Sequence, residues 1–143
     1  MRDFDIDKIF TEKPVMPMVI LDGIRDKVIA VRSINRDSYE EMLKTHRVWY
    51  YDGSADEIKM TGQDNGNTQR VIYIKFDDNF SSVLVSVEQK GFACCENDKT
   101  YDTCFINETY RRHHHKDNFT IKHKRFEQID IDKNFDYSKE DYE

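Results

Sequence analysis

Three cysteines and a pair of adjacent aspartates are the side chains of this 143-residue chain best suited to chemistry. Cys94, Cys95 and Cys104 are an odd number of thiols within one short segment, a pattern more typical of free thiols or a metal site than of a disulfide framework. The alternative is that they pack as small apolar residues after a strand. Asp77 and Asp78 lie between two apolar runs, where a rigid turn would present their carboxylates to a cation.

A β-hairpin is expected to position these groups. Residues 71–76 and 83–87 are rich in β-branched and aromatic side chains, which is typical of strands. Residues 77–81 between them are mostly short polar types that bond to their own backbone in turns. Because both faces of the hairpin are apolar, we place it inside a sheet rather than at an edge.

The rest of the chain predicts short elements around that hairpin. Pro17 within the apolar run 15–21 favours an irregular or edge strand, with residues 27–32 as its partner. Asn35 is a good N-cap for one short helix over residues 36–45, where apolar residues recur at helical spacing. We also expect strands at 47–51, 57–60 and 118–126, and an extended or loosely coiled segment at 5–13.

Bulk composition limits the class of protein. The length fits a single domain with its own core. A formal net charge of −6 argues against binding nucleic acid through a basic surface. No apolar run approaches membrane-spanning length and no apolar leader follows Met1, so we expect no membrane association and a cytoplasmic location, or host cytoplasm for a phage protein.

Four segments resemble the phosphoribosyl-AMP cyclohydrolase family. They are GNTQRV (66–71), VEQ (87–89), GFAC (91–94) and TCF (103–105). That family opens the adenine ring of an N1-ribosylated AMP in histidine biosynthesis. The resemblance covers residues 14–105 and implies an α+β domain with a mostly antiparallel β-sheet and one short helix. It also implies a homodimer with active sites at the interface.

The metal ligands that the resemblance implies are altered in this chain. The family's Asp-Cys-Asp-x-Asp tip, whose carboxylates hold magnesium and whose cysteine binds zinc, corresponds to residues 77–81. Asp77 keeps its place, but an amide and a hydroxyl replace the other two carboxylates and would bind magnesium weakly. Cys94 and Cys104 match the other zinc cysteines, and with Asp78 they form an acceptable zinc set. We expect no bound cofactor, with zinc and magnesium as alternatives.

Phosphate binding is altered as well. Three cations of the family are replaced by Gly53, Ala55 and Thr61, which should weaken binding of a substrate with two phosphates. We therefore expect a different adenine nucleotide as the ligand. The candidate ligand-binding residues named below also have structural interpretations: the loop as an ordinary turn, the aromatic residues as part of the core, and the charged residues as solvated surface groups. The candidate ligand-binding residues are an amide-rich loop, an aromatic strand and the remaining cations: Asn65, Gly66, Asn67, Trp49, Tyr51, Arg70, Arg111 and Arg112.

Two functions follow from these changes. Our prediction is a non-catalytic protein that sequesters a ribosylated adenine nucleotide, such as a cyclic ADP-ribose signal, as a phage anti-defence sponge. The alternative is a divergent cyclohydrolase with zinc and magnesium, and a structural dimer without a small ligand is a third possibility. A cyclohydrolase-like domain at 1–110 would carry the function, followed by an extension at 111–143 that is basic, then acidic, with room for one added strand.

Overall fold

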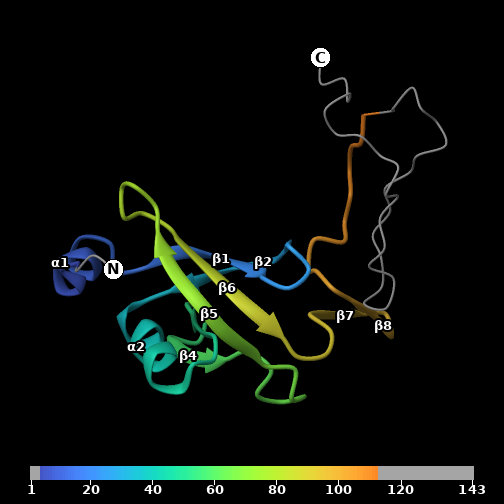
Figure 1. Ribbon diagram of the computed structural model, residues 1–143, viewed down its shortest axis with the longest axis horizontal. Helices are drawn as coiled ribbons and strands as arrows, with labels where there is room; N and C mark the ends of the chain where they lie inside the picture. Colours follow the sequence, from blue (N-terminus) through green and yellow to red (C-terminus); the bar gives the residue numbers. More distant parts are fainter. Residues whose placement is uncertain (1–3, 113–143) are drawn as a thin grey trace.

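A four-stranded sheet is the centre of the fold (Figure 1). In the computed structural model, which describes residues 4–112, its strands lie in the order β2-β1-β6-β5. β1 and β6 run parallel, whereas the pairs β1–β2 and β5–β6 are antiparallel. The predicted α+β class with a mostly antiparallel sheet is therefore confirmed. The bounds are β1 Met16–Asp22, β2 Lys27–Ile34, β5 Gln69–Phe76 and β6 Val83–Gln89.

Two helices and two small β-ribbons surround this sheet in the described part of the chain. Helix α2 contacts both strands of the β3–β4 ribbon, and β3 in turn contacts β2 of the main sheet. The β7–β8 ribbon follows β6 and lies at the other end of the sheet from α1 (Figure 1). The bounds are α1 Ile6–Glu12, α2 Arg36–Thr45, β3 Trp49–Asp52, β4 Glu57–Met60, β7 Cys94–Glu96 and β8 Lys99–Tyr101.

The predicted central hairpin forms as β5 and β6, but only one of its strands is interior. β6 lies between β1 and β5, and Val83, Val85 and Val87 are fully buried. β5 is an edge strand with Ile72 half exposed, so the prediction that the whole hairpin lies inside the sheet is wrong. An apolar run on two faces does not by itself distinguish a central strand from an edge strand.

β1 is central, so the prediction of an edge strand is wrong, although its pairing with β2 is irregular between Ile20 and Leu21. Pro17 lies before the residues that pair with β6, since that ladder begins at Met18. The missing N–H of the proline therefore removes no hydrogen bond from the β1–β6 ladder, and Pro17 is the second residue of β1, near the strand start where proline is tolerated.

The helix capped by Asn35 is confirmed, and a second helix, α1, replaces the predicted coil at 5–13. Asn35 accepts from the Ser38 N–H at 2.9 Å and donates its own backbone N–H to the Ser38 hydroxyl at 3.0 Å, which is a capping box. Asp5 likewise caps α1 by accepting from the Lys8 N–H at 3.1 Å. Burial of Phe10 against the ring of Tyr39, with centroids 5.6 Å apart, stabilises a helix too short to persist alone.

The core lies between the main sheet, α1 and α2. No helix within residues 4–112 has the length and apolarity needed to cross a membrane. The extension predicted at 111–143, including its strand at 118–126, lies outside the described residues except for its first two positions. The fully buried apolar side chains of the core are Met16, Met18, Ile20, Ile29, Ile34, Met42, Val48, Val83, Val85 and Val87.

Candidate functional site

Cys94, the first residue of β7, and Cys104, which follows β8, lie together. Burial, followed by the neighbouring Cys104 that it hydrogen-bonds, raises the pKa of Cys94 to about 11. The backbone N–H of Cys104 donates to the Ile29 carbonyl at 2.7 Å, and its Sγ accepts from Arg32 Nη2 at 3.7 Å. Cys95 is exposed to solvent instead. Two of the three predicted zinc ligands are therefore adjacent, and a metal would have to displace the Cys94 proton.

Asp77 organises the tip of the β5–β6 hairpin. Its Oδ1 accepts from the backbone N–H of Asn79 at 3.2 Å and of Ser81 at 2.8 Å. Its Oδ2 accepts from the hydroxyls of Ser81 at 2.9 Å and Ser82 at 2.7 Å. The neighbouring Asp78 is exposed and has no hydrogen bond to any described residue. Both oxygens of Asp77 are committed to the turn, so this tip does not fit the magnesium site that the resemblance implies.

The hairpin tip and the cysteines lie at opposite ends of β6. Asp78 precedes this strand and Cys94 follows it, and seven residues of extended chain span about 23 Å. Figure 1 shows the β5–β6 turn and the β7–β8 ribbon far apart along the sheet. Within residues 4–112 no three acidic, thiol or imidazole side chains converge on one point. One copy of the described chain therefore does not assemble the predicted set of Asp78, Cys94 and Cys104.

The protonation of Asp77 provides a test of its role in the turn. The hydrogen bonds of the Ser81 N–H and then the Ser82 hydroxyl hold the pKa of Asp77 well below its usual range. A lowered folded pKa stabilises the protein above the unfolded value of about 3.9, and this stabilisation is lost as pH falls below it. We expect Asp77→Asn to flatten the fall in the free energy of unfolding between about pH 5 and pH 3.

Urea unfolding of metal-free protein at several pH values measures that slope. Asp78→Asn is the matched control, because Asp78 is the next residue and makes no such hydrogen bonds. It should keep the slope of the unmutated protein. Equal slopes for the two variants would contradict the role assigned to Asp77.

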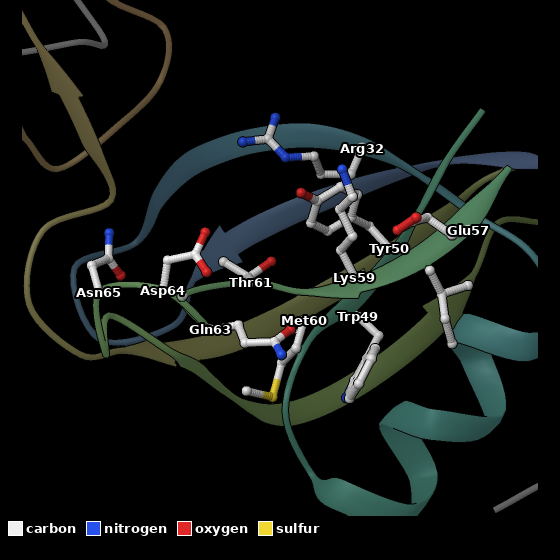
Figure 2. Close-up of a pocket in the computed structure, with 12 residues that line it drawn as sticks. Arg32, Trp49, Tyr50, Glu57, Lys59, Met60, Thr61, Gln63, Asp64 and Asn65 are labelled. Atoms are coloured by element: carbon white, nitrogen blue, oxygen red, sulfur yellow. The ribbon is translucent and has the colours of Figure 1, made fainter. Parts of the chain in front are cut away.

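A cavity of about 590 Å³ opens beside the β3–β4 ribbon and the loop that follows it (Figure 2). This size suits a small-molecule ligand. Both cations and acidic side chains line it, together with two aromatic rings from β3. The lining residues are Arg32, Trp49, Tyr50, Glu57, Ile58, Lys59, Met60, Thr61, Gly62, Gln63, Asp64 and Asn65.

The register of β3 and β4 decides which aromatic side chain faces the cations. Tyr50 pairs with Lys59, and Trp49 pairs with Met60, so each pair shares one face of the ribbon. Figure 2 shows Tyr50 and Lys59 on the side of Arg32, and Trp49 and Met60 on the other side. Trp49 Nε1 donates to the Thr45 hydroxyl at 3.0 Å, which anchors that ring toward α2. The ligand-binding residues selected from this aromatic strand were Trp49 and Tyr51, whereas Tyr50 is the ring that shares its face with the two cations.

Tyr51, another predicted ligand residue, does not line the cavity. Its hydroxyl donates to Asp56 Oδ1 at 2.8 Å in the turn between β3 and β4, and this hydrogen bond raises the pKa of Tyr51. Tyr51 therefore stabilises the turn between β3 and β4.

The predicted amide-rich loop is closed by tight packing around Asn67. Asn65 lines the cavity, and its Oδ1 accepts from the Asn67 N–H at 2.9 Å. Gly62 has a φ of +79° and Gly91 a φ of +70°, and a Cβ on either would lie 2.2 Å from an Asn67 oxygen. Gly66 has a φ of +80° but open space around it. The loop thus contacts the segment that leads to Cys94. This contact joins two of the motifs that carry the resemblance, GNTQRV at 66–71 and GFAC at 91–94.

The predicted arginines lie away from this cavity. Arg70 forms an ion pair with Glu88 at 2.7 Å and lines a second hollow of about 370 Å³ with Arg47. Arg111 makes a bidentate pair with Glu108, with distances of 2.6 and 2.7 Å. Arg112, like Arg111, is absent from the lining of both cavities. The basic residues at 123–125 lie outside the described part of the chain.

Comparison with known proteins bears directly on the function. A profile of the phosphoribosyl-AMP cyclohydrolase family matches residues 31–106. The phosphoribosyl-AMP cyclohydrolase of Nitrosopumilus maritimus is 32% identical over 108 residues, which cover 74% of this chain and 97% of that protein. The histidine biosynthesis bifunctional protein HisIE of Halalkalibacterium halodurans is 35% identical over 88 residues, 62% of this chain and 42% of that protein. The chain spans about two fifths of the length of such bifunctional relatives.

These relatives overturn the prediction of a non-catalytic sponge. Their names describe phosphoribosyl-AMP cyclohydrolases and a histidine biosynthesis bifunctional protein, and nothing in the matches supports sequestration of cyclic ADP-ribose or an anti-defence role. The prediction relied on the loss of individual ligands, whereas the similarity extends over almost the whole of a curated cyclohydrolase. The alternative, a divergent cyclohydrolase, is the better supported interpretation. The family profile matches more than half of the residues of this chain, and the chain therefore belongs to the phosphoribosyl-AMP cyclohydrolase family.

Proposed function

We propose that this protein is a phosphoribosyl-AMP cyclohydrolase, an enzyme that adds water to the adenine ring of N1-ribosylated AMP and opens it. The observation that carries the proposal is the family match over residues 31–106, which extends from β2 through the cavity to Cys104. The matched part of the bifunctional relatives is less than half of each of those proteins. The proposal therefore concerns the cyclohydrolase reaction alone.

One chain supplies two of the three protein ligands that a catalytic zinc ion needs. Cys94 and Cys104 are adjacent thiols, and zinc in catalytic sites is held by three protein ligands with one position left for water. In the homodimer that we also propose, Asp78 of a second copy would be the third ligand. Bound zinc would lower the pKa of a water molecule toward neutrality and so supply a nucleophile.

Side chains of the protein would bind and orient the substrate. Arg32 donates to Cys104 Sγ, and this contact places the guanidinium beside the thiols. Asp64 and Asn65 are exposed on the loop beside the cavity and offer oxygen acceptors to hydroxyl groups of a ribose. Placing the purine between this loop and the thiols would hold the reacting carbon near the activated water, which converts a bimolecular step into a positioned one.

Turnover tests the proposed reaction directly. Untagged protein purified without a chelator should convert phosphoribosyl-AMP, as followed by absorbance and by mass spectrometry of the product. Cys104→Ser should lose most of its zinc and most of its turnover, because a hydroxyl is a poor replacement for a thiolate. Cys95→Ser is the matched control, since Cys95 is exposed beside the pair, and it should retain its zinc content. Zinc-loaded protein without turnover would contradict the proposed reaction.

A further inference from the structure

The cavity contains two cations that the sequence interpretation did not select. We propose that Arg32 and Lys59 bind a phosphate group of the substrate and take over from the cations replaced at Gly53, Ala55 and Thr61. This inference deepens the proposed function and rests on it for the identity of the substrate. It assigns Arg32 and Lys59 to binding and specificity rather than to the chemical step.

Arg32 is a half-buried guanidinium without a carboxylate partner among the described residues. Nη1 donates to the Val31 carbonyl at 3.2 Å and Nη2 to Cys104 Sγ at 3.7 Å. Its Cζ lies 5.9 Å from the centre of the Tyr50 ring, so the guanidinium group lies over that ring. A guanidinium has five N–H donors, so donors remain for an oxyanion. Within residues 4–112 this partly buried charge has no counter-ion, which favours binding of an anion.

Lys59 adds a second charge on the same face. It pairs across the ribbon with Tyr50, the residue on which Arg32 stacks, and Figure 2 shows the three side chains grouped together. Its Nζ donates to Asp52 Oδ2 at 2.7 Å, and an ammonium has three donors, so two remain. Asp52 thus holds the Lys59 ammonium without using all of its donors.

The acidic residues of the cavity favour a nucleotide over a free phosphate ion. Glu57 and Asp64 also line the cavity, so its charges balance, and a site for inorganic phosphate alone would gain nothing from carboxylates. A nucleotide combines an anionic phosphate with ribose hydroxyls that donate hydrogen bonds to carboxylates. The arrangement therefore fits a phosphate at Arg32 and Lys59 and a sugar at the loop that contains Asp64.

Arg32→Met and Lys59→Met test this assignment with two independent readouts. Each variant should raise KM for phosphoribosyl-AMP roughly 10- to 100-fold with a smaller change in kcat, because a charge-assisted contact to the substrate is lost. Calorimetric titration with 5′-AMP should show a similar loss of affinity. Titration with adenosine, which lacks the phosphate, should show little difference between variant and unmutated protein.

Lys44→Met is the control for a change of one positive charge. Lys44 lies on α2 with its side chain 72% exposed, and it should leave KM and 5′-AMP affinity unchanged. Because Arg32 also contacts Cys104, zinc content is measured for every variant, and Lys59 offers a test without that contact. Arg32→Lys keeps the charge and should recover part of the affinity, and it carries the test if Arg32→Met does not fold.

The outcomes separate this inference from the proposed reaction. If the unmutated protein turns over and both methionine variants keep its KM and 5′-AMP affinity, the phosphate assignment is wrong and the cyclohydrolase proposal stands. If adenosine binding falls as much as 5′-AMP binding, the cations shape the cavity and do not contact the phosphate, which also overturns the assignment. If zinc-loaded protein shows no turnover but the variants lose 5′-AMP selectively, the assignment is supported and the proposed reaction fails.

Discussion

Lys27→Met is expected to lower the free energy of unfolding by about 3 kcal/mol or more. Lys27 Nζ donates to Asp102 Oδ2 at 3.0 Å, and the Asp102 side chain is 1% exposed. The other oxygen of that carboxylate has no hydrogen-bond partner in the described chain. Removing the ammonium would leave a buried charge without a partner, and such a loss costs far more than breaking a surface ion pair.

A double-mutant cycle separates the buried charge from lost packing. Asp102→Asn alone removes the carboxylate charge but leaves Lys27 able to reach solvent, since its side chain is 28% exposed. The double variant Lys27→Met, Asp102→Asn should therefore recover a large part of the stability lost in Lys27→Met. Urea unfolding at pH 7 provides the free energies. A double variant no more stable than Lys27→Met would show that packing, rather than the unpaired carboxylate, causes the loss.

Gly62→Ala is expected to lower the free energy of unfolding by about 2 kcal/mol or more. Its backbone is left-handed, with a φ of +79°, and this conformation alone costs an alanine about 1 to 2 kcal/mol. The added methyl group would also lie 2.2 Å from the Asn67 carbonyl oxygen, which belongs to rigid backbone. The loop must therefore open to admit the side chain.

Gly66→Ala isolates the steric part of that effect. Gly66 has a φ of +80°, nearly the same as Gly62, but a Cβ there meets no atom within 4 Å. It should show the conformational cost without the clash, so its loss in urea unfolding should be clearly smaller than that of Gly62→Ala. Equal losses would mean that the loop relaxes freely around residue 62.

The sequence predicted those elements whose signals are local. The Asn35 cap, the helical spacing over residues 36–45 and the hairpin formed by β5 and β6 depend on neighbouring residues, and the structure confirms them. α1 and the central position of β1 depend on contacts with distant residues, such as Phe10 against Tyr39. Propensity does not report such contacts, which override it.

The candidate site was less predictable because its geometry depends on register and long-range packing. Shifting β3 by one residue would exchange the faces of Trp49 and Tyr50, and no composition argument fixes that register. Arg32 enters the cavity from β2, a strand selected only as scaffold. Counting replaced ligands position by position therefore suggested a lost activity, because it did not consider cations that the fold brings to the cavity from other positions, such as Arg32 and Lys59.

Asn67 packs between Gly62 and Gly91. This contact joins the cavity-lining loop at residues 61–65, here called the rim, to the segment at residues 89–94 that leads to Cys94, here called the arm. The backbone oxygen of Asn67 abuts Gly62 and its side chain abuts Gly91, while the Gln89 amide donates to carbonyl oxygens on both segments. A ligand that displaces the rim must also displace the arm. If ligand binding at the two segments is coupled through this contact, the coupling is reciprocal, and each ligand changes the affinity for the other by the same factor.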